Sequence, residues 1–318
     1  MGKFILLVSM NKSLLNKSIL VLMGGESSER EVSLLSGKNV LNSLVELGFK
    51  VKSLDCSGNF IPKLRNIDPD ICFNALHGKG GEDGKIQGLL ESEGIPYTHS
   101  GVYSSSSAMN KAFSKELFKK NNIKTPSYKI IKINELRKIK YKNPFVIKPI
   151  NEGSSKGVYV ILNESGMNNL IDIQNKWVYG DKVLIEDYIK GKEITCSVNG
   201  NQVTEVMEIF TNTDFYDYEA KYTNGASEHI IPAKIPSSIS KLVQEISLKA
   251  HKIFKCKGVT RSDFRFDENF GSDGLFILEI NTQPGMTSTS LVPELFSRIG
   301  FSFNDLVISL LEDASCNR

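Results

Sequence analysis

The alternation of apolar runs with glycine-rich loops and helical patterns constrains the fold of this chain more than any other feature. Residues 19–23 form a continuous apolar run, Gly24 and Gly25 interrupt it, and a helical pattern follows that ends at Gly48. Further strands are expected at residues 51–55 and 71–76. Strands that alternate with helices form a parallel sheet, whose ligands bind where the strands end in loops. We therefore expect an α/β unit at residues 18–102.

The first helix carries a start signal. Ser28 is followed three residues later by Glu31, and this spacing predicts a capping box and a helix that begins near Glu29. The helical period predicts an inward apolar face made of Val32, Leu35, Leu41, Leu44 and Val45.

Beyond Gly101 the pattern changes toward paired strands. Two expected strands flank a Gly/Ser loop at residues 151–157, which predicts a hairpin flap. Residues 210–233 lack periodicity, and a loop of this length is usually a functional lid or disordered. The expected elements are a helix at 111–121, strands at 145–150, 158–162, 183–188, 193–198 and 202–209, a helix at 239–254, strands at 259–266 and 275–280, and a terminal helix from Ser302.

Composition favours a small partner. The chain has 39 Lys and Arg against 36 Asp and Glu, and this near balance indicates neither nucleic-acid nor membrane binding. The five scattered cysteines lack a Cys-x-x-Cys pair and indicate reduced thiols in a cytoplasm. No apolar run approaches a membrane span of roughly 20 residues. Residues 1–17 contain only a short apolar run without a cleavage site, so we interpret them as an appended or frayed leader rather than a signal peptide.

Two C-terminal strands carry polar side chains that would meet if the strands pair. Arg261 and Asp263 share one face of the first strand, while Glu279 and Asn281 share a face of the second, with Leu278 and Ile280 opposite. Oxygen ligands without His or Cys suit a hard cation such as Mg²⁺. The alternative, from the strands alone, is a salt bridge on a half-exposed sheet.

A second group of residues is typical of phosphate binding. Lys148 lies in an apolar strand and must find an anionic partner or an exit to solvent. The glycines of residues 153–157 free backbone N–H groups that suit a phosphate, although most such turns are only turns. The chain has no dinucleotide or Walker motif at these loops, and Glu26 places an acid where a pyrophosphate would sit.

Five segments stand in order along nearly the whole chain from Ser18: GGESSEREVS at 24–33, LHGKGGEDG at 76–84, KP at 148–149 with EGSS at 152–155, YDYEAKY at 216–222 and EINTQPGMT at 279–287. Together they resemble the D-alanine–D-alanine ligase family of ATP-grasp enzymes. The resemblance implies an α/β (α+β) fold with a three-domain ATP-grasp architecture. The expected domains are an N-terminal domain at 18–102 and two ATP-clasping domains at 103–190 and 191–318.

The resemblance also implies an activity. One D-alanine would attack the γ-phosphate of ATP, and the resulting acyl phosphate would react with a second D-alanine to give D-alanyl-D-alanine, ADP and phosphate for peptidoglycan precursors. Such phosphoryl transfer needs mainly positioning and charge neutralisation. The implied cofactors are ATP and two Mg²⁺ ions, for which Mn²⁺ can substitute, in a cytoplasmic homodimer without nucleic-acid or membrane partners.

The resemblance assigns roles to individual residues. The metal ligands would be Asp263, Glu279 and Asn281, with Glu279 between the two ions. The ATP-binding residues would be Lys111, Lys148, Ser154, Ser155, Glu186, Asp187, Ile189, Glu193 and Lys221. Without the family, Lys111 would be interpreted as a solvated helix charge, and Glu186 and Glu193 as exposed strand residues.

For the amino acids, Glu29 would bind the first ammonium group, with helix-dipole complementarity as its alternative role. His77 would lie near the carboxylate of that substrate, and Ser290 and the Leu291 backbone would bind the second carboxylate at a helix start. The catalytic residues would be Glu29, Ser154, Tyr222, Arg261 and Gly285. Of these, Arg261 and the Gly285 N–H would stabilise the tetrahedral intermediate.

The loop at 210–233 resembles the family's mobile lid, from which Tyr222, like Ser154 of the flap, would bond toward Glu29. Ligases that use D-lactate usually lack this tyrosine, so Tyr222 argues against the alternative of a related enzyme with D-lactate or D-serine as second substrate. A catalytically dead nucleotide-binding scaffold would be favoured had Lys148, Asp263 or Glu279 been replaced. The flap departs from the family at Lys156, where small or apolar residues are usual.

Overall fold

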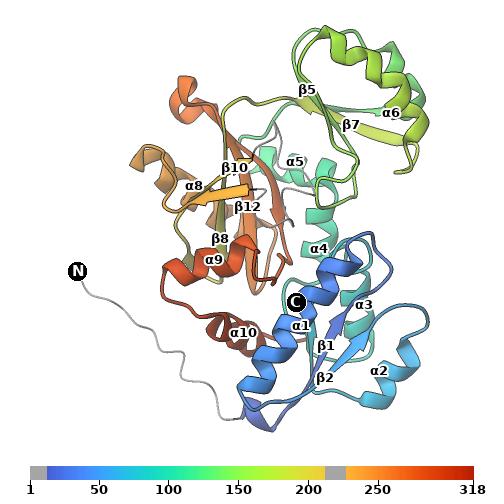
Figure 1. The fold of residues 1–318 in the computed structure, drawn as a ribbon, viewed down its shortest axis with the longest axis vertical. Coiled ribbons are helices and arrows are strands. Elements are labelled where there is room, and N and C mark those ends of the chain that lie inside the picture. The colour runs from blue at the N-terminus through green and yellow to red at the C-terminus, as the bar shows by residue number, and fades with distance from the viewer. Residues whose placement is uncertain (1–12, 212–226) are drawn as a thin grey trace.

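The computed structural model describes residues 13–211 and 227–318 (Figure 1). Its N-terminal sheet has the strand order β2 (Lys50–Asp55), β1 (Ser18–Met23), β3 (Ile71–Asn74), and both pairings are parallel. The accompanying helices are η1 (Leu14–Asn16), α1 (Arg30–Glu46), α2 (Ile61–Ile67) and α3 (Lys85–Ser92). The predicted parallel α/β arrangement is therefore confirmed, and Gly48 follows the end of α1 with a φ of 81°.

The start of α1 differs from the expectation. Glu29 is the N-cap residue, and no side chain caps the helix, so the predicted capping box of Ser28 and Glu31 is wrong. Instead, the Glu29 N–H donates to Ser27 Oγ (3.1 Å), whose hydroxyl donates to the His77 carbonyl oxygen (2.6 Å). The neighbouring loop after β3 thus fixes this turn.

The buried face of α1 also differs. Val32 and Leu44 are buried as predicted and Leu41 is partly buried, but Leu35 and Val45 are 57% and 61% exposed. Small residues take their place, among them Gly37, where an added Cβ would lie 2.5 Å from Met23 Cβ. At Gly37 the helix approaches β1 so closely that a larger side chain would require a shift of Met23.

The central sheet is antiparallel, in the order β4 (Tyr128–Lys132), β7 (Lys182–Asp187), β5 (Phe145–Lys148), β6 (Tyr159–Ile161). It is flanked by η2 (Ile133–Lys138), η3 (Glu164–Asn169) and α6 (Leu170–Lys176). The predicted hairpin is confirmed, because β5 and β6 pair from Phe145↔Ile161 to Ile147↔Tyr159 around the loop at 151–157. We call residues 151–157 the flap.

The third sheet has the order β11 (Ser227–Ile230), β10 (Met207–Thr211), β8 (Lys192–Asn199), β12 (Val259–Phe266), β13 (Leu275–Asn281), and β9 (Gln202–Val203) pairs with β8. Its helices are α8 (Ser237–Ile253), η4 (Glu268–Gly274), α9 (Leu291–Arg298) and α10 (Phe303–Glu312). A single strand at 202–209 was expected, which is wrong. The Thr204 hydroxyl accepts the Ser197 N–H (3.0 Å). This side-chain bond interrupts the backbone pairing with β8 at the point between β9 and β10.

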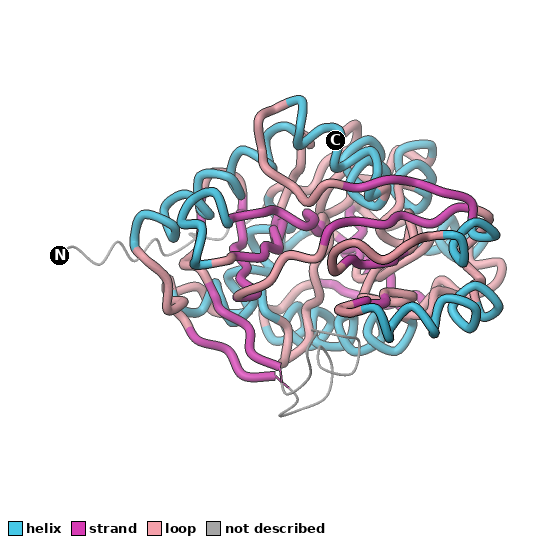
Figure 2. The backbone as a smooth tube through the Cα atoms, turned by 90° about the horizontal axis from the view of Figure 1, so that it is seen from above, coloured by secondary structure: helices cyan, strands magenta, loops and turns pink. Residues whose placement is uncertain are grey.

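Two helices join the sheets. Sequence patterns did not indicate α4 (Val102–Met109), whereas α5 (Lys111–Lys120) lies where a helix was expected and is capped by Asn110. Ala108 and Phe118 pack with the core of the third sheet. Seen from above, most helices lie toward the outside and strands run between them (Figure 2).

The C-terminal helices return to the N-terminal sheet, and α10 lies beside α1 in Figure 1. Phe296, Leu306 and Leu310 share one buried cluster with residues of β1 and α1. Leu14 and Leu15 also pack against this cluster, so the end of the expected leader is ordered; residues 1–12 lie outside the described part. Within the described ranges, no helix has the length and apolar character needed to cross a membrane.

Candidate active site

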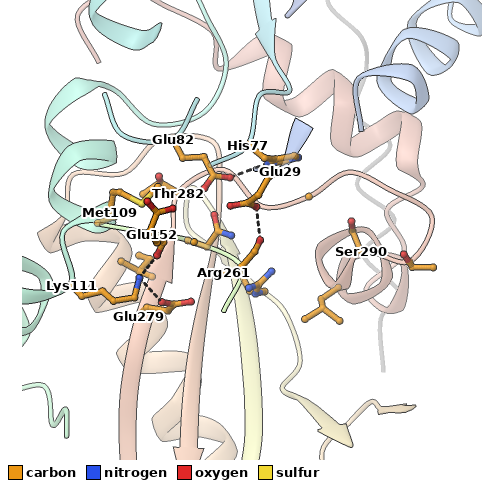
Figure 3. A pocket seen from close by; sticks show the side chains of 18 residues that line it. Glu29, His77, Glu82, Met109, Lys111, Glu152, Arg261, Glu279, Thr282 and Ser290 are labelled. Atoms are coloured by element: carbon orange, nitrogen blue, oxygen red, sulfur yellow. Dashed lines mark hydrogen bonds and ion pairs between the residues drawn. The ribbon is translucent and has the colours of Figure 1, made fainter. Parts of the chain in front are cut away.

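Two adjoining cavities lie where the three sheets meet. The first cavity opens between the N-terminal loops, the flap and the ends of β12 and β13 (Figure 3). The second lies between the central sheet and the third sheet. Four residues line both cavities and form their common wall: Lys111, Glu152, Gly153 and Glu279.

Most residues singled out in the sequence divide between these cavities by the role expected of them, but Ser154, which was also expected to bind ATP, lines only the first. Those expected to contact the amino acids line the first cavity: Glu29, His77, Ser154, Arg261, Gly285, Ser290 and Leu291, together with Asn281. Those expected to contact the nucleotide line the second: Lys148, Ser155, Glu186, Asp187, Ile189 and Glu193, together with Asp263. Lys221 and Tyr222 lie outside the described residues.

The two polar strands pair as the metal-site hypothesis required. β12 and β13 are antiparallel with Arg261 opposite Asn281 and Asp263 opposite Glu279. A β-bulge follows Asp263, and Leu278 therefore faces the second cavity beside Glu279, which makes the expectation that it points to the opposite face wrong. The extra residue of a bulge re-aims neighbouring side chains toward one face.

The Asp263 carboxylate has two partners. Arg261 donates to both of its oxygens (2.8 and 2.7 Å), and the Thr195 hydroxyl donates to Oδ1 (2.7 Å). The salt bridge considered as the alternative for these strands is therefore present. This salt bridge holds the Asp263 carboxylate in place and balances its charge, as a bound cation would also do.

The donor set fits a hard cation. Glu279 lines both cavities, Asp263 lines the second and Asn281 the first, so two carboxylates and an amide oxygen bracket the common wall. Lys111 Nζ lies 3.6 Å from Glu279 Oε2 (Figure 3). Mg²⁺ normally takes one or two carboxylates and completes its shell with waters and phosphates, which this open wall permits.

Lys148 has an anionic partner, as expected for a lysine in an apolar strand. Its ammonium pairs with Glu186, whose other carboxylate oxygen lies 2.7 Å from Lys115 Nζ. Lys115 is fully buried and also donates to Thr125 Oγ1 and the Pro126 carbonyl oxygen. Burial lowers the pKa of Lys115 to about 8, whereas the two lysines outweigh burial and lower the pKa of Glu186.

Neither Glu186 nor Glu193 is an exposed strand residue, which was the alternative for both. Glu186 is only 4% exposed, and the Glu193 carboxylate accepts a hydrogen bond from Arg265 (3.2 Å), which also donates to the Ile189 carbonyl oxygen (3.1 Å). The alternative of a solvated Lys111 is likewise wrong. Lys111 is buried, and its ammonium donates to the Glu152 carbonyl oxygen of the flap.

The flap closes over Glu29. The Ser154 hydroxyl donates to the Glu29 carboxylate, and a Cβ added at Gly153 would lie 2.9 Å from Glu29 Oε1. Ser154 and Ser155 have φ values of 49° and 57°, in the left-handed region. Non-glycine residues occupy this region at an energetic cost, which surrounding contacts must offset.

His77 is buried within a polar chain. Its Nδ1 lies 2.9 Å from Glu82 Oε1, and its Nε2 lies 2.9 Å from Ser36 Oγ, which accepts the Met286 N–H (3.1 Å). Burial disfavours the charged imidazole, but Glu82 and then Glu29 raise the pKa of His77 above its ordinary value. The chain connects the loop after β3 with the segment after β13.

Ser290 lies at the N-cap of α9, the helix start expected near the second carboxylate. Its Oγ accepts the Thr287 N–H (2.9 Å), and a Cβ added at Gly285 would lie 2.7 Å from it. The helix N-terminus favours an anion at this end of the first cavity.

Sequence reasoning missed Glu82 and Arg265, which line the cavities, and Lys115, which is buried against Glu186, although signals existed for all three. Lys115 lies four residues after Lys111, on the same helix face. Arg265 follows Asp263 at the strand period of two, and Glu82 stands inside the segment at 76–84 that also contains His77. All five cysteines are free thiols, and none lines either cavity.

Comparison with known proteins agrees with this geometry. Models of the D-ala D-ala ligase N-terminus and C-terminus match residues 57–100 and 113–312. The D-alanine--D-alanine ligase of Parvibaculum lavamentivorans is 45% identical over 304 residues, which cover 95% of this chain and 99% of that protein.

Two solved structures share the fold. An ATP complex of D-alanine--D-alanine ligase from Bacillus anthracis has a TM-score of 0.75 and 30% identity, covering 93% of this chain and 97% of that one. The VanG D-Ala:D-Ser ligase from Enterococcus faecalis has the same TM-score and 28% identity, covering 93% and 98%. The three-sheet architecture and these matches over nearly the whole length together establish that the chain belongs to the D-alanine–D-alanine ligase family of ATP-grasp enzymes.

Proposed function

We propose that the protein joins two D-alanine molecules to D-alanyl-D-alanine at the expense of ATP, releasing ADP and phosphate for peptidoglycan precursor synthesis. The observation that carries this function is the common wall of the two cavities. A nucleotide in the second cavity and an amino acid in the first would meet at Lys111 and Glu279. The γ-phosphate of the nucleotide and the carboxylate of the amino acid would then lie next to each other and could react.

The second cavity supplies the nucleotide contacts. The pair of Lys148 with Glu186 would open to let the lysine bind phosphate, while buried Lys115 continues to neutralise the carboxylate. The edge of β7 up to Ile189 would bind the adenine, and Glu193 the ribose hydroxyls. Asp263, Glu279 and Asn281 would hold Mg²⁺, which when bound neutralises charge on the phosphates.

The first cavity supplies the amino-acid contacts. Glu29 would bind the ammonium group of the first D-alanine and thereby point its carboxylate toward the common wall. Arg261 and the Gly285 N–H would stabilise the negative oxygen that develops when the second amine attacks the acyl phosphate, and a single such donor is worth about 3 kcal/mol. Ser290 and the start of α9 would hold the second carboxylate.

Product analysis tests this function directly. Purified protein with MgATP and D-alanine should release phosphate and dipeptide in equal amounts. D-Lactate and D-serine, offered together with D-alanine, should compete poorly as second substrates. Absence of D-alanine-dependent phosphate release would contradict the proposal, and preferential formation of a mixed product would redirect it.

We further propose that residues 18–102, 103–190 and 191–318 act as three units in a cytoplasmic homodimer that uses two Mg²⁺ or Mn²⁺ ions. Separate buried clusters in the N-terminal and central sheets support the division. Family resemblance alone supports the dimer, and light scattering of the purified protein would test it.

A further inference from the structure

We propose that Lys156 is a positioning residue that latches the flap to the start of helix α1 and so keeps water from the acyl phosphate. The proposal rests on the ligase function above. It concerns a residue for which the expected chemistry provides no role.

The latch is a direct contact between distant parts of the chain. Lys156 Nζ donates to the Ser28 carbonyl oxygen at 2.6 Å, across 128 residues of sequence. The Ser154 hydroxyl of the same flap donates to the carboxylate of the next residue, Glu29. Two side chains of the flap, two positions apart, therefore hold two successive residues of the N-terminal domain.

The Ser28 carbonyl is well placed to accept this bond. The turn before α1 uses its neighbours in the local backbone, because the Arg30 N–H donates to Ser27 O (3.2 Å) and the Ser33 N–H donates to Glu29 O (3.0 Å). A charged donor forms a stronger hydrogen bond to a carbonyl than a neutral one. The ammonium thus meets a backbone atom that cannot rotate away.

The backbone of the flap transmits the latch to the cavity. The Lys156 N–H donates to Gly153 O (3.1 Å), which closes a tight turn around Ser154 and Ser155. Gly153 already lies so near Glu29 that an added Cβ would displace its carboxylate. A displacement of Lys156 would therefore move the turn that covers Glu29 and the common wall.

A competing role for Lys156 is phosphate binding, because the residue also lines the second cavity. Lys111 and Lys148 line that cavity as well and project from a helix and a strand. Lys156 instead reaches out of the flap to the N-terminal domain. The geometry points to a latch. The two roles can be distinguished, because loss of the Lys156 charge would have a different effect on the acyl phosphate in each case.

If the flap loosens, water enters and attacks the acyl carbon of the intermediate. The bond from that carbon to the phosphate oxygen breaks, D-alanine is regenerated and inorganic phosphate leaves. ATP is then consumed without dipeptide, so the ratio of phosphate to dipeptide rises above one. A lost phosphate contact would instead raise the KM for ATP and leave this ratio unchanged.

The experiment compares the variants Lys156→Met, Lys156→Arg and, as a matched control, Lys176→Met, an exposed lysine of the same domain outside both cavities. With saturating MgATP, Lys156→Met should roughly double the ratio of phosphate to dipeptide and raise the KM for D-alanine about fivefold. Lys156→Arg should restore most of the coupling, and the control should behave as the unchanged protein.

Hydrogen exchange gives a readout that does not depend on turnover. Amides of residues 151–157 should exchange about tenfold faster in Lys156→Met than in the control variant. Unchanged exchange and an unchanged ratio would overturn the latch, as would a raised KM for ATP with full coupling. If the unchanged protein released no phosphate with D-alanine, the proposed function would fail, and the exchange measurement would still decide the latch.

Discussion

At the scale of single residues, the cavities are lined by charges that already have partners. Asp263 is held by Arg261, and Glu186 by two lysines. Buried charges require such compensation, because their transfer from water is costly. Binding of nucleotide and metal would therefore exchange partners within existing pairs, which leaves the surrounding fold undisturbed.

The substitution Glu279→Gln should abolish turnover and leave the fold intact. The side chain is one-third exposed and lies 3.6 Å from the Lys111 ammonium, and glutamine preserves its size, so we expect the chain to fold. We expect kcat to fall by at least about 10²-fold, because a ligand shared by the expected ions is lost. Phosphate release with D-alanine measures the rate, and circular dichroism with thermal unfolding checks the fold. A rate near that of the unchanged protein would refute the metal assignment.

His77 should make stability depend on pH in a defined direction. Glu82 and Glu29 raise its folded-state pKa above the unfolded value of 6.5, so its stabilisation is complete below that value and is lost as pH rises through the folded pKa. Glu82→Gln should remove most of this term. The difference in unfolding free energy between the two proteins should therefore be largest below pH 6.5 and shrink as the pH rises through the folded-state pKa of His77.

Imidazole NMR provides the check on this assignment. Burial lowers the pKa of His99 to about 3 and that of His251 to about 4, so neither titrates in the same range. A stability difference that grows with rising pH would contradict the predicted sign.

At the scale of elements, close packing decides which helix positions tolerate side chains. Helix α1 presents small residues to β1, whereas Gly88 of α3 has room for a Cβ at ordinary van der Waals distance from its neighbour. The two glycines occupy ordinary helix positions with the same intrinsic cost relative to alanine. Their surroundings differ, and this difference yields a matched pair of variants.

Gly88→Ala should stabilise the protein by about 0.5–1 kcal/mol, because among the described residues the added Cβ would meet Val102 Cγ2 alone within 4 Å, at 3.9 Å. Gly37→Ala should destabilise it by about 1–3 kcal/mol, because its Cβ would overlap Met23 of β1. Urea unfolding of both variants measures the two changes. If Gly37→Ala also stabilised the protein, helix propensity would outweigh the packing described here.

At the scale of the whole molecule, the second cavity lies between two separately built sheets. Residues of β5 and β7 form one wall, and residues of β8, β12 and β13 form the other. A nucleotide bound there contacts both units at once. Binding should therefore stabilise the folded chain as a single cooperative unit.

MgATP at about 100 times its Kd should add about 2.7 kcal/mol and raise the Tm by roughly 5 °C. Removal of the metal with EDTA, at constant ATP, should reverse most of this shift, because Asp263 and Glu279 would then face the phosphates without a cation between them. Thermal unfolding of the unchanged protein and of Glu279→Gln measures the effect, and the variant should show a smaller magnesium-dependent part. A shift that ignores EDTA would contradict the role of these carboxylates.

Local pattern was sufficient wherever neighbouring residues in the chain determine the structure. The strand period placed Asp263 and Glu279 correctly, and the flap hairpin followed from two apolar strands around a glycine-rich loop. The demand of Lys148 for an anionic partner followed from burial alone, because a lone buried charge is too costly. The sequence segments also identified the family.

Tertiary structure alone decided which distant residues meet. The bulge that turns Leu278 toward the second cavity, the burial of Lys115 against Glu186 and the close approach of Gly37 to Met23 all arise between segments far apart or from irregular pairing. No local pattern records them, because packing density and charge compensation depend on what the folded chain brings alongside. The sequence by itself thus determined the family, the strands and the polar residues available for chemistry. The folded chain determined how these residues divide between two cavities and which charged groups pair with one another.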